Sequence, residues 1–121
     1  MTTQRAPAPP KGSGPSGRAL WRDVLSKYEL EEHEQALLRE AVRSVDQLDK
    51  LHAIVENDGL IISGPNDVPR MHPAAVEARQ LRIALARVIA ALRLPADDDG
   101  ELHRPQRRVG VRGIYSVKKG S

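Results

Sequence analysis

The side chains able to do chemistry in this 121-residue chain are four histidines, a short run of carboxylates and a set of arginines and lysines. The histidines lie 19, 20 and 31 residues apart, so no pair has the spacing that places two metal ligands on one helix face. We therefore predict no local metal site. We expect His33 at the surface or cap of a helix, His52 with a partner in a helix–helix interface, His72 at a helix start and His103 in a tail.

No other pattern points to an enzyme. Asp97, Asp98 and Asp99 lack the spaced ligands and fixed glycine of a calcium loop, and they indicate a solvated acidic turn. Residues 63–65 lack the lysine and the glycine spacing of a phosphate loop, and no serine lies in a nucleophile elbow. The absence of cysteine excludes disulfides, thiolate zinc sites and cysteine nucleophiles. We predict a non-catalytic protein with no metal and no cofactor.

The basic residues gather at the C-terminal end. Residues 17–94 carry 11 basic and 12 acidic side chains, whereas residues 102–121 carry six basic side chains and no carboxylate. A near-neutral body with a basic tail is typical of proteins that bind an anionic polymer, although a terminal basic tail can also serve solubility alone. The residues we predict to contact nucleic-acid phosphates are Arg104, Arg107, Arg108, Arg112, Lys118 and Lys119.

Three helices are expected to form the ordered part. Residues 1–16 are rich in Pro, Gly, Ser and Thr, which predicts a disordered leader. Apolar residues at helical spacing predict a short helix over residues 17–28 with Ser16 as N-cap, and longer helices over 32–56 and 73–94. Pro73 suits the first position of the last helix.

The two long helices carry heptad stripes, and the connection between them, residues 59–72, can turn the chain around. It permits a small hairpin, although Pro69 limits the second strand. The predicted fold class is all-α, a short N-terminal helix packed on a long antiparallel helical hairpin with disordered N- and C-terminal tails. The predicted divisions are the leader 1–16, a helical oligomerisation core 17–95 and a flexible basic tail 96–121.

The last helix has more apolar surface than one partner helix covers. Its second set of apolar residues, Val76, Ile83 and Ile89, is the predicted oligomer interface, since an ordered region of about 80 residues without disulfide or metal often needs such help. A three-helix monomer is the alternative. With no run of roughly 20 apolar residues and no signal-peptide pattern, we expect a soluble protein of the cytoplasm.

Three stretches of the chain resemble the small subunit of tailed-phage terminases. They are Gly17-Arg18-Ala19-Leu20-Trp21 continuing through residues 28–41, then residues 45–51 with Asp58-Gly59, then His72-Pro73-Ala74 leading an alanine-rich helix to Pro95. The order of these pieces carries the likeness over residues 17–95. Members often have Asp where Glu31 stands, which predicts a looser helix start here.

This resemblance implies DNA packaging in a phage or prophage. Such subunits assemble into rings, bind viral DNA and regulate a large subunit that holds the ATPase and nuclease. The implied partners are double-stranded DNA, the terminase large subunit and further copies of the chain, in the host cytoplasm and without a membrane. Two other functions stay open: an adaptor whose basic tail docks on a larger protein, and a helix-turn-helix regulator, which the acidic start of the second helix disfavours.

Overall fold

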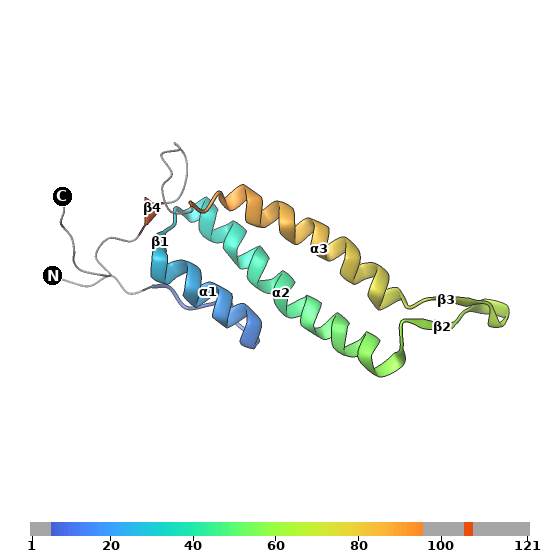
Figure 1. Cartoon of the computed structure of the whole chain (residues 1–121). Helices are drawn as coiled ribbons and strands as arrows, with labels where there is room; N and C mark the ends of the chain where they lie inside the picture. The colour runs from blue at the N-terminus through green and yellow to red at the C-terminus, as the bar shows by residue number, and fades with distance from the viewer. Residues whose placement is uncertain (1–5, 96–105, 108–121) are drawn as a thin grey trace, which may run out of the picture.

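The computed structural model of the chain describes residues 6–95 and 106–107. Its three helices are α1 (Pro15–Lys27), α2 (Glu32–Asp58) and α3 (Pro73–Leu92). α2 and α3 form an antiparallel pair, and α1 lies along the N-terminal half of α2 (Figure 1). At 1.5 Å per residue, α2 is about 40 Å long and α3 about 30 Å. The prediction of three helices is confirmed, and every helix boundary lies within two residues of its predicted position.

Short strands make the all-α prediction only partly correct. β2 (Ile61–Ser63) and β3 (Pro69–Met71) form an antiparallel hairpin around a 3₁₀ turn, η1 (Pro65–Asp67). In this turn Asn66 and Asp67 have φ angles of 59° and 60°, in the left-handed region that Asn and Asp tolerate. A second antiparallel pair joins β1 (Tyr28–Glu29) to β4 (Gln106–Arg107). The hairpin that the sequence permits is present, and Pro69 stands at the beginning of its second strand.

The apolar core is divided into two clusters along α2. One cluster joins all three helices and comprises Trp21, Val24, Leu25, Tyr28, Leu38, Val42 and Leu92. The other joins only α2 and α3, through Leu48 and Leu51 packed on Ala74 and Ala78. The small alanine side chains let the two helices approach closely. The half of the molecule next to the hairpin is therefore two helices thick within the described residues.

The N-terminal segment is ordered over more residues than the sequence predicts. The indole Nε1 of buried Trp21 donates a hydrogen bond to the carbonyl of Pro7 at 2.8 Å. The Ser13 hydroxyl donates to the carbonyl of Pro10 at 2.6 Å. A buried indole N–H needs an acceptor, and the proline-rich segment supplies it. The predicted disordered leader is therefore wrong for residues 6–14, and residues 1–5 lie outside the described residues.

A carboxylate of α2, rather than Ser16, caps α1. The side chain of Asp46 accepts hydrogen bonds from the backbone N–H groups of Gly14 and Gly17, each at 2.7 Å. These bonds pair amides that a helix N-terminus leaves open. The hydroxyl of Ser16 donates to Asp49 instead. The predicted Ser16 cap is wrong, because the cap comes from a residue about 30 positions away in sequence.

The start of α2 is closed by a capping box, so the expected looseness at Glu31 is not observed. The backbone N–H of Glu31 donates to Oε1 of Glu34 at 2.7 Å, and Glu34 is buried. The side chain of Glu34 therefore gives the helix a defined start at Glu31.

Candidate functional site

The predicted DNA-contacting tail is described only at β4. Arg107 lies in β4 with its Cα opposite that of Tyr28, whereas Arg104, Arg108, Arg112, Lys118 and Lys119 lie outside the described residues. The buried Tyr28 hydroxyl donates to the carbonyl of Pro95 at 2.8 Å. Two contacts thus hold the chain that follows α3 against the corner between α1 and α2. Residues 106–107 pair with β1, and the rest of the predicted flexible tail lies outside the described residues, so that prediction stays untested.

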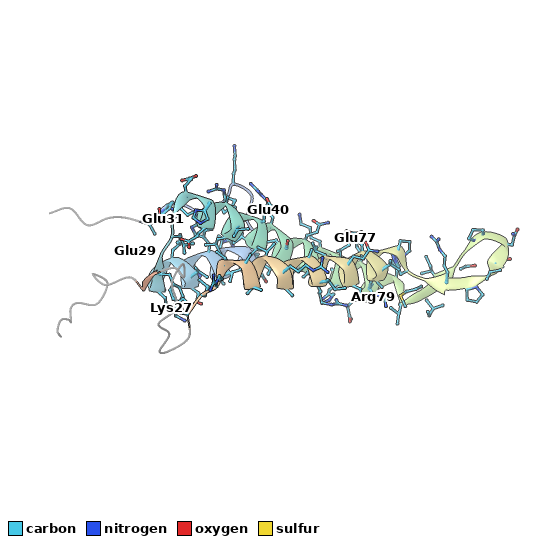
Figure 2. All side chains as sticks on the ribbon, turned by 90° about the horizontal axis from the view of Figure 1, so that it is seen from above. Lys27, Glu29, Glu31, Glu40, Glu77 and Arg79 are labelled. Carbon is cyan, nitrogen blue, oxygen red and sulfur yellow. The ribbon has the colours of Figure 1, made fainter. Side chains whose placement is uncertain are left out.

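Carboxylates surround the corner where β4 is held. Glu29, Glu31 and Glu32 are exposed there, and Figure 2 shows Glu29 and Glu31 at the end of the molecule far from the hairpin. These charges suit the positive N-terminal end of α2. They repel phosphate, so the corner itself is a poor DNA surface, but its charge is complementary to a basic chain segment.

A second set of basic residues, on α3, was missed in the sequence. Arg79, Arg82 and Arg87 are exposed, and α3 carries only one carboxylate, Glu77. Within the part of the chain that the structure describes, Arg79 and Arg87 take part in no salt bridge. They lie about 12 Å apart along the helix and about 80° apart around it. The net charge of residues 17–94 does not reveal this set, because the basic side chains of α3 are offset in the sum by the acidic side chains of α2.

The predicted oligomer residues do not form one stripe. Val76 is half-buried, whereas Ile83 and Ile89 are 51% and 37% exposed. Ile89 lies about 120° around α3 from Ile83. Arg79 and Arg87 stand four residues on either side of Ile83, so an interface centred there would also cover two arginines. Whether these residues contact another copy stays a prediction.

A larger exposed apolar surface lies at the hairpin end. Leu60, Ile61, Val68 and Met71 are each between 41% and 59% exposed, and Ile54 of α2 is also exposed nearby in sequence. Beside them is an open groove of about 430 Å³ between α2 and α3, lined by His52, Val55, Glu56, Leu60, Ala75, Ala78 and Arg82. The sequence predicts a connection over residues 59–72, and the structure shows that its apolar side chains are exposed.

His52 and Arg82 meet at the rim of this groove. Nη1 of Arg82 lies 3.4 Å from Nε2 of His52, which joins α3 to α2. The expectation for His52 is met in part: it has a partner on the other helix, but its side chain is exposed and not enclosed in the interface.

His72 joins the two long helices and is not free to act as a base. Its Nδ1 accepts the backbone N–H of Ala74 at 2.9 Å, and its Nε2 lies 2.8 Å from Oδ2 of Asp58. The hydrogen bond from His72, followed by one from Asn57, lowers the pKa of Asp58. An Asp–His pair also orients general bases in enzymes, but here both ring nitrogens are occupied. The prediction that His72 begins a helix is confirmed.

The described residues contain neither a cluster of metal ligands nor a membrane-spanning helix. No group of three or more potential metal ligands occurs among them, and none of their helices is long and apolar enough to cross a membrane. No family model, no curated protein and no solved structure matches this chain. The likeness to terminase small subunits therefore stays a prediction from the sequence.

Proposed function

We propose that this protein is a non-catalytic, oligomeric DNA-binding subunit. In this proposal it acts as terminase small subunits do, binding viral DNA and regulating a larger ATPase and nuclease subunit during packaging. The observation that carries the proposal is the basic outer side of α3. Arg79 and Arg87 are exposed and form no salt bridge with any carboxylate of the described residues, and they lie on the helix that precedes the basic tail.

Exposed arginines on a helix surface suit phosphate better than any apolar ligand. Arginine binds phosphate oxygens through its planar set of N–H donors, and each neutralised phosphate releases counterions into solution. One copy offers few such contacts on its described surface. Several copies that engage one duplex together would add their contacts, so the oligomer and the DNA contact support each other.

Fluorescence polarisation with a labelled duplex of about 30 base pairs tests this function. The first variant removes residues 102–121, and the second is Arg79→Gln with Arg87→Gln. Arg22→Gln with Lys50→Gln is the matched control, because it removes the same charge from exposed positions on α1 and α2. We expect each test variant to weaken binding about 10-fold or more and the double arginine variant to reduce the salt slope by about 2. The control should stay close to wild type.

Two results would contradict the proposal. Equal losses in the control and in the double arginine variant would mean that net charge alone is measured. Absence of wild-type binding at about 50 mM salt, where phosphate contacts are strong, would reject DNA as the partner.

The adaptor function is the second candidate, and the exposed apolar residues of the hairpin end favour it. It predicts that all the variants above leave DNA affinity unchanged. It also predicts that a peptide of residues 102–121 retains one defined protein partner after nuclease treatment. Loss of that partner on nuclease treatment would reject it.

A further inference from the structure

The β2–β3 hairpin extends beyond the ends of α2 and α3 (Figure 1). Both of its faces carry exposed apolar side chains. Ile61 lies opposite Met71 on one face, and Leu60 and Val68 lie on the other. An isolated two-stranded hairpin is marginally stable in water at best. A hairpin with this composition is typical of a strand pair that is completed by further structure.

The hydrogen bonds of the hairpin show which backbone groups remain open. The N–H of His72 donates to the carbonyl of Leu60 at 2.7 Å, and the N–H of Gly64 donates to the carbonyl of Val68 at 2.8 Å. Antiparallel strands alternate bonded and non-bonded pairs. The backbone N–H and C=O groups of Ile61 and Ser63 therefore point away from β3, along the outer edge of β2.

The two edges of the hairpin differ in their ability to accept another strand. On β3, the outward positions are Pro69 and Met71, and Pro69 has no N–H to donate. β3 also carries the charged Arg70, which would face its own copy if two β3 strands met. β2 contains only Ile61, Ile62 and Ser63, so it has a complete set of outward donors and acceptors and no charge. Two β2 strands can therefore meet without like-charge repulsion.

We propose that the outer edge of β2 is the contact surface for a second copy of this chain. The two β2 strands pair antiparallel about a twofold axis, with Ile62 opposite Ile62 of the second copy. In this register Ile61 lies opposite Ser63 of the second copy, and every outward N–H and C=O of these two residues is paired. The result is one sheet that is continuous across both copies.

Such a contact is self-complementary and closes at two copies. Larger assemblies then require a second contact elsewhere on the molecule. The inference concerns the oligomeric part of the proposed function, and it holds whether or not the protein binds DNA. Measurements of mass without nucleic acid therefore distinguish failure of this contact from failure of DNA binding.

The test compares two proline variants of the same hairpin. Ile61→Pro removes one of the two outward N–H groups of β2, and Met71→Pro removes the one outward N–H of β3. Neither N–H is used inside the hairpin, so each variant retains the internal bonds, and far-UV circular dichroism checks the helices. Ile61→Thr shortens the apolar side chain but keeps the N–H.

Sedimentation velocity over a range of concentrations gives the dissociation constant of the pair. We expect wild type to associate, Ile61→Pro to weaken association about 10-fold or more, and Met71→Pro to stay close to wild type. Ile61→Thr should retain most of the association. Three results would overturn the proposal: a single-copy wild type at about 1 mM, an unchanged Ile61→Pro, or equal losses in both proline variants.

Discussion

Substitution of Gly17 by alanine is expected to destabilise this protein, although alanine is the better helix former. A Cβ atom at Gly17 would lie 2.8 Å from both Cγ of Asp46 and Cγ1 of Val42, closer than such atoms approach in proteins. Asp46 would have to move, and its hydrogen bonds to the N–H groups of Gly14 and Gly17 would be lost. The close packing of α1 on α2 and the cap of α1 therefore both depend on the absence of a Cβ atom at Gly17.

The expected change in the free energy of unfolding of Gly17→Ala is the sum of three contributions. Loss of a helix cap costs about 1 kcal/mol, and overpacking of a close helix contact costs about 1–3 kcal/mol. Replacement of glycine by alanine inside a helix stabilises the helix by about 0.5–1 kcal/mol. The net loss is about 2 kcal/mol, which corresponds to a fall in Tm of about 10 °C for a domain of this size.

Urea and thermal unfolding, followed by far-UV circular dichroism at one protein concentration, measure this loss. Ala19→Gly, on the exposed side of α1, gives the reference for helix propensity alone. Asp46→Ala removes the cap and some of the crowding, so Gly17→Ala should cost clearly less in that background. A Gly17→Ala variant as stable as wild type, or an equal cost with and without Asp46, would refute the reasoning.

Two further predictions concern the N-terminal segment and the link between the long helices. Deletion of residues 2–10 removes the hydrogen-bond acceptor of the Trp21 indole. We therefore expect a red shift of the fluorescence emission of this single tryptophan and a lower Tm. Emission unchanged from wild type would show that the segment does not cover the indole ring. For Asp58, the hydrogen bond from His72 lowers the pKa of the carboxyl group in the folded state. The ionised carboxylate therefore stabilises the folded state above its usual pKa of about 4. This stabilisation is lost as the pH falls through the pKa of the folded state. Asp58→Asn should therefore make the free energy of unfolding less dependent on pH below about 5. A pH dependence equal to that of wild type, measured by urea unfolding at acid pH, would contradict this assignment.

Much of the helical architecture follows from local sequence. The starts and ends of α2 and α3 were predicted to within two residues, because Gly59 and Pro73 end and begin helices through their own backbone chemistry. His72 was recognised as a helix start for the same reason. Heptad stripes on two segments joined by a short connection led to the antiparallel pair. Each of these inferences uses residues close together in the chain.

The candidate sites were harder to predict, since they depend on which surfaces remain uncovered. The summed charge of residues 17–94 is close to zero, and this sum obscures Arg79 and Arg87 on α3, a helix with a single carboxylate, Glu77. Ile89 was grouped with Ile83 in the predicted interface, although a six-residue step turns a helix through 600°, which leaves the two side chains about 120° apart. Exposure and partner choice are properties of the folded chain rather than of a segment.

The sequence by itself determined three helices, their lengths, the turn between the long pair and the positive charge of the C-terminal residues, because helix propensity, capping and charge act over a few residues. Only the tertiary structure decided that Asp46 caps α1, that Pro7 accepts the Trp21 indole, and that β4 pairs beside Tyr28. These contacts join residues 14 to 79 positions apart. No local pattern encodes such a pair, because its stability comes from helix packing that brings the two groups together.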